Sequence, residues 1–134
     1  MKKYKVAILL GSDSDLVNIK DAVKVFEEFS IESYVTVSSA HRSPQRTHDL
    51  VSDLYKDGVK VIIAGAGLAA HLAGVVASIF PLVVIGLPFK AGALNGVDSL
   101  YSTVQMPPGI PVATVGVNSD ANAALLAVQV LAVS

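Results

Sequence analysis

Short apolar runs alternate along the chain with longer stretches in which apolar residues recur at helical spacing. The runs predict strands over residues 5–10, 31–37, 59–64, 82–87 and 111–117. The stretches between them predict helices that begin near Leu16, at Pro44, at Ala69 and near Asn122. Near-continuous apolar strands separated by helices are typical of a parallel sheet covered on both faces. We therefore predict a three-layer α/β/α sandwich that forms a single domain over residues 1–134.

Two of these helices carry further local signals. The first is expected to bury one apolar face, made by Leu16, Ile19, Val23 and Phe26. In the second, Ser43 is the predicted N-cap and the helix stops at Gly58.

Composition narrows the possible functions. With 52% apolar and 16% charged residues, the chain is expected to be ordered around one core. No apolar run reaches the roughly 20 residues of a membrane span, and VAILL (6–10) is too short for a signal peptide, so we expect a cytoplasmic protein that binds no membrane. A net charge of −1 without a basic patch disfavours nucleic-acid binding. The absence of cysteine excludes disulfides and thiolate chemistry.

Charged residues are scarce in the second half. From Val61 to Ser134 they are only Lys90, Asp98 and Asp120. A monomer rarely exposes so much apolar surface, so we expect a homo-oligomer whose interfaces come largely from this half.

Polar and glycine-rich segments follow the first three predicted strands: GSDSD (11–15), SAHR (39–42) and GAGLAAH (65–71). In parallel α/β sheets, ligands bind beyond the carboxyl ends of the strands, so these three loops predict one binding site. In the first loop, Ser12 and Ser14 would face a phosphate and Asp15 would accept hydrogen bonds from sugar hydroxyls. The commoner role for such residues is helix capping, by Asp13 or Ser14, and this alternative stays open.

The segment VSSAHRSPQR (37–46), which includes the second loop, holds both arginines of the chain. Arg42 precedes the predicted helix and can bind an anion with two hydrogen bonds. His41 can act as a general acid or base near neutral pH. The alternative is a surface ion pair beside an incidental histidine. For Arg46 and His48, on the predicted helix, a solvated structural role is favoured.

The third loop matches G-x-G-x-x-A, the pattern of dinucleotide-binding loops. Such sites also need an acidic residue at the end of the next strand, and residues 83–90 (VVIGLPFK) contain none, so we reject NAD as a cofactor. The glycines are instead predicted to let the backbone approach a ligand closely. His71 can be a structural histidine or part of the same site. The pattern of histidines predicts no metal site, and no Walker A motif or nucleophile elbow is present.

Five ordered motifs extend this reading over nearly the whole chain. They resemble the N5-carboxyaminoimidazole ribonucleotide mutase family, and they are GSDSD (11–15), SAHRSP (39–44), AGAGLAAHLAG (64–74), DSLYSTVQMP (98–107) and ANAALL (121–126). The resemblance implies a flavodoxin-like sandwich, assembled as an octamer. It also implies an isomerase of purine biosynthesis that moves a carboxylate from N5 to C4 of an aminoimidazole ribonucleotide without metal, cofactor or ATP.

The resemblance also implies roles for individual residues. His41 matches the proton-transfer residue, and the substrate-binding positions are Ser12, Ser14, Asp15, Ser39, Arg42, Gly67, Ala70, His71 and Leu72. The chain departs from the family at Leu68, usually glycine, and at Ala73, usually proline, so we expect a lid of different shape. It also ends at Ser134, where relatives continue into another helix, which bears on the expected interface.

Other functions remain as alternatives. A related carboxylase takes aminoimidazole ribonucleotide and CO2 directly, but its third loop reads like G-R-S-N, whereas this loop contains a histidine. A non-catalytic phosphosugar- or flavin-binding module would share the fold. A phospho-receiver domain would need an aspartate at the end of the third strand, which here reads Ile63-Ala64-Gly65.

Overall fold

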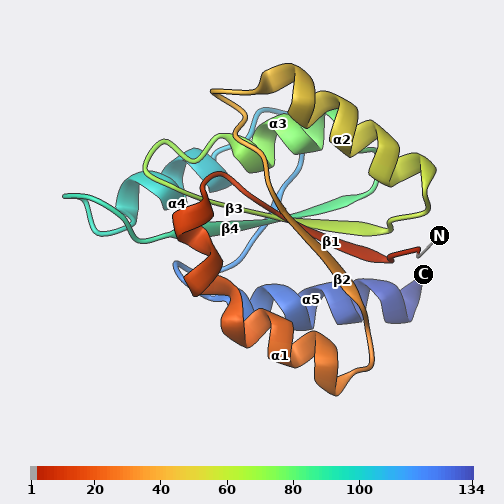
Figure 1. Cartoon of the computed structure of the whole chain (residues 1–134). Helices are drawn as coiled ribbons and strands as arrows, with labels where there is room; N and C mark the ends of the chain where they lie inside the picture. The colour runs from red at the N-terminus through yellow and green to blue at the C-terminus, as the bar shows by residue number, and fades with distance from the viewer. Residues whose placement is uncertain (1–2) are drawn as a thin grey trace.

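A five-stranded parallel sheet forms the centre of the computed structural model, which describes residues 3–134 (Figure 1). The strand order is β2-β1-β3-β4-β5. The strands are β1 (Val6–Leu10), β2 (Ser33–Val37), β3 (Val61–Gly67), β4 (Val83–Phe89) and β5 (Ala113–Thr114). From β1 the chain adds β2 on one side, and from β3 it adds β4 and β5 on the other side. The strand order therefore reverses between β1 and β3, and such a switch point is where open α/β sheets bind ligands.

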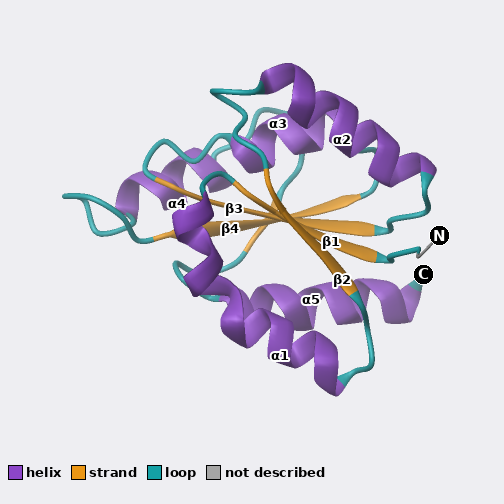
Figure 2. Ribbon diagram, viewed as in Figure 1, coloured by secondary structure: helices purple, strands orange, loops and turns teal. Residues whose placement is uncertain are grey.

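Helices cover both faces of the sheet (Figures 1 and 2). They are η1 (Asp13–Ile19, a 3-10 helix), α1 (Lys20–Glu28), α2 (Pro44–Lys56), α3 (Leu72–Ile79), α4 (Val97–Val104) and α5 (Asp120–Val133). Helices α1 and α5 pack together on one face, and α2 and α3 cover the other. The predicted three-layer parallel sandwich is confirmed.

Alternate residues of β1 build the two cores. Val6, Ile8 and Leu10 pack against the α1 and α5 side, whereas Ala7 and Leu9 pack against the α2 and α3 side. All five are fully buried. This two-sided burial explains why the run has no polar alternation in sequence.

A buried carboxylate joins the two helices on the first face. Asp120, at the start of α5, accepts a hydrogen bond from the Ala22 backbone N–H of α1 over 2.9 Å, and Asp120 is only 7% exposed. Among residues 3–134, no helix is long and apolar enough to cross a membrane.

The structure corrects the prediction in three places. The first helix starts as the 3-10 helix η1, whose three residues per turn rotate Leu16 out of the core, so Leu16 is 45% exposed. The fifth strand is only two residues long, at the sheet edge. Helix α4 was not predicted, because Ser and Thr weaken its helical signal; it is held by Ser99, whose Oγ donates to the Phe89 carbonyl over 2.7 Å.

Candidate active site

The three predicted loops meet around one cavity of about 410 Å³, beyond the carboxyl ends of β1, β2 and β3. This is a suitable volume for a small organic ligand. The lining residues are Gly11, Ser12, Ser14, Asp15, Ser39, Ala40, His41, Arg42, Ala66, Gly67, Leu68, Ala69, His71, Leu72 and Ala91. All the predicted site residues except Ala70 therefore line a common cavity.

The loop after β1 supplies the polar end of the cavity. Ser12 caps η1, because its Oγ accepts the Ser14 backbone N–H over 3.3 Å, so neither Asp13 nor Ser14 is the cap. The Ser12 and Ser14 hydroxyls are 3.0 Å apart. Partial burial raises the pKa of the Asp15 carboxyl, and the nearby Asp13 charge raises it further, against a backbone hydrogen bond from Ser12 that lowers it.

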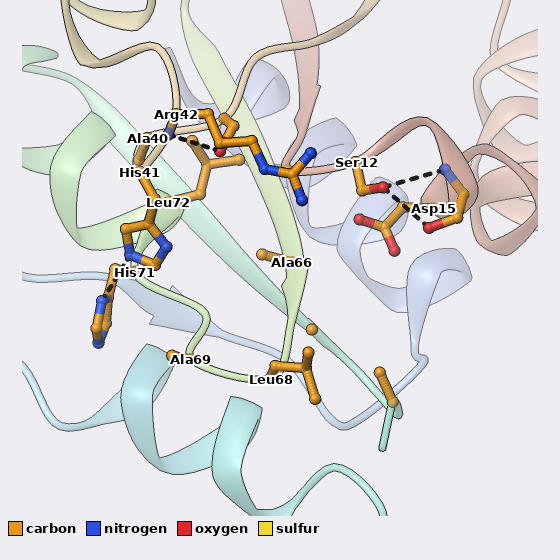
Figure 3. A pocket seen from close by; sticks show the side chains of 15 residues that line it. Ser12, Asp15, Ala40, His41, Arg42, Ala66, Leu68, Ala69, His71 and Leu72 are labelled. Carbon is orange, nitrogen blue, oxygen red and sulfur yellow. Dashed lines mark hydrogen bonds between the residues drawn. The ribbon is translucent and has the colours of Figure 1, made fainter.

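The loop after β2 presents His41 and Arg42, both exposed, to the opposite side of the cavity. The Arg42 backbone N–H donates to Ser39 Oγ over 3.1 Å, which shapes the turn beneath the two side chains. Figure 3 shows the Arg42 guanidinium extending toward the side of the cavity that carries Ser12 and Asp15. Arg42 is thus placed to bind an anionic group there.

The other two polar residues of this region do not line the cavity. The Arg46 guanidinium donates to the Val37 carbonyl over 2.6 Å, at the end of β2. His48 is exposed and lies 3.6 Å from the Asp49 carboxylate. Both positions agree with the structural role predicted for them.

His41 and His71 form a hydrogen-bonded pair at the edge of the cavity. His41 Nε2 and His71 Nδ1 are 2.9 Å apart, with the rings edge to face (Figure 3). One of these nitrogens must carry the proton and the other must be bare. The pair therefore occupies His41 Nε2 and leaves Nδ1 as the nitrogen that can exchange a proton with a ligand.

The glycines of the third loop have a different role from the one predicted. A Cβ on Gly65 would lie 2.7 Å from the Phe89 ring, and a Cβ on Gly67 would lie 3.0 Å from Ala91 Cβ. Both glycines therefore make room for β4 and the loop that follows it. The expectation that these glycines let the backbone approach a ligand closely is wrong for Gly65, which does not line the cavity. Gly67 does line it.

Two further expectations for this loop are corrected. Ala70 is 2% exposed and does not line the cavity; its N–H donates to Ser102 Oγ of α4 over 3.1 Å. Ala73 is 3% exposed, belongs to the core and does not line the cavity; its Cβ lies 3.5 Å from where Gly86 would carry a Cβ, so it does not shape a lid. Leu68, in contrast, lines the cavity in a left-handed conformation with φ of 55°.

Residues 5–134 match the protein family described as AIR carboxylase. The chain belongs to this family. The resemblance found in the sequence motifs is therefore confirmed.

Several family relatives are similar over nearly all of this chain. N5-carboxyaminoimidazole ribonucleotide mutase from Pyrococcus abyssi is 55% identical, over 96% of this chain and 74% of its own length. The protein of the same name from Thermotoga maritima is 52% identical, over 96% of this chain and 75% of its own length. Phosphoribosylaminoimidazole carboxylase from Saccharomyces cerevisiae is 53% identical over 98% of this chain, but over only 23% of its own length.

A solved family structure supports the fold. The crystal structure of Treponema denticola PurE matches with a TM-score of 0.85 and 30% identity, over 96% of this chain and 80% of that chain. The agreement extends across the sheet and its helices, so the flavodoxin-like α/β architecture is confirmed.

Sequence reasoning missed the apolar part of this family site. Ala40, Ala66, Ala69 and Ala91 line the cavity, but alanine carries no chemical signal in a sequence. Ser102 was missed as well, because α4 was not predicted; its hydroxyl lies 3.4 Å from the Leu68 carbonyl and thereby holds the third loop. Within residues 3–134, no three His, Cys, Asp or Glu side chains gather as metal ligands would.

Proposed function

We propose that this protein is an isomerase of purine biosynthesis that converts N5-carboxyaminoimidazole ribonucleotide to 4-carboxy-5-aminoimidazole ribonucleotide. Similarity to the mutases of P. abyssi and T. maritima supports this function. The observation that carries the proposal is the placement of His41 and Arg42 in one cavity with Ser12 and Asp15. An acid–base group and an anion-binding group thus act on the same small ligand.

The substrate is proposed to span the cavity. Arg42 and the hydroxyls of Ser12 and Ser14 bind the 5′-phosphate, because a guanidinium and hydroxyl donors suit phosphate oxygens. Asp15 accepts hydrogen bonds from the ribose hydroxyls. The imidazole base then lies toward His41 and His71, against walls to which Ser39, Gly67 and Leu72 contribute. Ala70 supports the loop through its N–H and does not touch the substrate.

The reaction needs one proton to leave and return. His41, as the imidazolium, gives its Nδ1 proton to N5 while the N5–carboxylate bond breaks, and the electron pair of that bond remains on N5 as CO2 forms. Carbon C4 then attacks CO2 and forms a carbon–carbon bond. The C4 proton returns to His41, which restores the aromatic ring and the starting state of the enzyme. His71 holds Nε2 throughout, so the exchanging nitrogen stays the same.

The released CO2 must stay in the cavity until C4 attacks it, because CO2 that diffuses into solvent is lost to the second step. The apolar side chains of Ala40, Ala66, Leu72 and Ala91 line the same cavity as the histidine pair. They offer no polar group that would attract water to the released CO2, and a held reactant behaves as if it were highly concentrated.

The deciding experiment supplies two substrates to the pure protein. N5-carboxyaminoimidazole ribonucleotide is mixed with the enzyme in one arm, and aminoimidazole ribonucleotide with bicarbonate in the other, with formation of the C4 acid followed in both. We expect rapid product formation in the first arm. Product only in the second arm would show that the protein is a direct carboxylase and not a mutase. The S. cerevisiae relative is named as a carboxylase. No product in either arm, with a yellow protein, would favour a flavin-binding module.

We also propose that the protein works in the cytoplasm as a homo-oligomer, most simply an octamer. Support comes from α4, where Val97, Tyr101 and Val104 lie at helical spacing and are 49%, 63% and 45% exposed, next to Leu94 at 61%. An apolar stripe of this kind is costly in water and is typical of an interface. Mass photometry at micromolar concentration tests the assembly; a monomer would contradict it.

A further inference from the structure

Two hydroxyl groups lie buried directly beneath the loop of residues 39–43, which carries His41 and Arg42. Ser38 Oγ and Thr47 Oγ1 are 2.7 Å apart. Ser38 is 2% exposed and Thr47 is fully buried. Buried hydroxyls are unfavourable unless they are hydrogen-bonded, and these two hydroxyls are partners of each other.

Packing of α2 does not require a hydroxyl at position 47. Thr47, Val51 and Leu54 are the buried residues of α2, and their spacing places them on one face. The other two are apolar, as a core-facing stripe requires. A helical threonine commonly bonds the carbonyl four residues earlier, and Thr47 Oγ1 lies 3.0 Å from the Ser43 carbonyl. The contact with Ser38 is of a different kind, because it joins the helix to the end of β2.

The Thr47 hydroxyl contacts both ends of the 39–43 loop. Its Oγ1 lies 3.3 Å from the Ser39 carbonyl and 3.0 Å from the Ser43 carbonyl. A hydroxyl donates one hydrogen and can also accept one. Ser38 Oγ can therefore donate to Thr47 Oγ1 while Thr47 donates to one end of the loop. The loop is further closed by the Ser43 N–H, which donates to the Ser39 carbonyl over 2.9 Å.

We infer that Thr47, paired with Ser38, is a positioning residue for the reaction proposed above, on which this inference rests. Thr47 does not line the cavity and touches no substrate. It fixes the 39–43 loop so that the His41 ring stays 2.9 Å from His71 and Nδ1 stays free. Because proton transfer depends on this geometry, a displacement of about 1 Å can lower the rate by up to about 100-fold.

Three variants separate positioning from stability. Thr47→Val keeps the side-chain shape and leaves the Ser38 hydroxyl unpaired. The double variant Ser38→Ala/Thr47→Val removes both polar groups, a replacement that is close to neutral for stability when the two were partners. Thr47→Ser retains the hydroxyl. The matched control is Val51→Ala, one turn further along α2 and fully buried, which destabilises the same helix without removing a polar contact.

Melting temperature and kcat with N5-carboxyaminoimidazole ribonucleotide are measured for each variant. We expect kcat to fall about 10- to 100-fold in both Thr47→Val and the double variant, although the double variant recovers much of the lost stability. Thr47→Ser should keep kcat within about threefold of the original chain, and Val51→Ala should lower only the melting temperature. If the double variant regains kcat together with stability, the hydroxyl pair has a purely structural role. Should Thr47→Val not fold, the double variant alone gives the result.

NMR of the histidine side chains makes the test independent of turnover. The ring resonances of His41, assigned by their loss in His41→Asn, should shift in the double variant and stay unchanged in Val51→Ala. Unchanged His41 resonances in the double variant would overturn the inference even if the enzyme turns over. If the original chain converts neither substrate, the proposed function fails, and the resonances still decide whether the hydroxyl pair positions the loop.

Discussion

Replacing Arg42 tests where the phosphate binds. A unit charge pair 4 Å apart is worth about 1 kcal/mol in water and about 4 kcal/mol at an effective dielectric constant of 20. Arg42 is exposed, so its interaction lies between these values. Measured hydrogen bonds to charged groups fall at about 1.5–3 kcal/mol, and we take about 2 kcal/mol for Arg42→Ala. This corresponds to a rise of about 30-fold in the dissociation constant.

The assay is calorimetric titration with aminoimidazole ribonucleotide and, separately, with the nucleoside that lacks the phosphate. Arg42→Ala should weaken nucleotide binding about 30-fold and leave nucleoside binding almost unchanged, because only the nucleotide carries the charge that Arg42 contacts. Lys56→Ala, at the far end of α2, matches the change in net charge and should alter neither. Added salt should weaken nucleotide binding more for the original chain than for Arg42→Ala.

Two results would refute this reasoning. Equal losses for nucleotide and nucleoside would show that Arg42 contacts the sugar or base, or shapes the loop. An unchanged nucleotide affinity would show that the phosphate does not contact Arg42. Arg42→Lys refines the outcome, because lysine keeps the charge but loses the two-pronged contact, and we expect an intermediate affinity.

Three further predictions follow from the site. His41→Asn should fold normally, since His41 is exposed, bind aminoimidazole ribonucleotide with little change, and lose about 10²- to 10⁴-fold in kcat; an unchanged kcat would remove His41 from the mechanism. The raised pKa of Asp15 means that the folded protein disfavours the ionised carboxyl, so stability falls as the pH rises through that pKa. Asp15→Asn should therefore raise the melting temperature at pH 7 in calorimetry, with the gain vanishing below the ordinary value of 3.8, and an equal gain at all pH values would contradict this cause. Leu68→Gly should stabilise the protein against urea by up to about 1 kcal/mol, because Leu68 has a φ of 55° that glycine adopts without strain, and a large destabilisation would show that its packing outweighs the strain.

Much of the architecture could be read from local patterns. The four long strands and the helices α1, α2, α3 and α5 follow from apolar runs and helical spacing, which depend on neighbours in sequence. The residues with distinctive chemistry, such as His41 and Arg42, were identified for the same reason: they follow strands, and strand ends of a parallel sheet share one edge. Helix α4 escaped prediction because its stability comes from packing on β4 and from the Ser99 hydrogen bond, and its own helical propensity is weak.

The sequence by itself determined the layers of this protein and the loops that carry its chemistry. Only the tertiary structure decided how those loops meet. It places His41 within hydrogen-bonding distance of His71, 30 positions away, and it buries Ala70. It also decided that Gly65 makes room for Phe89. The physical reason is that these contacts join segments distant in sequence, and their distances depend on sheet order and packing, which no local pattern of residues encodes.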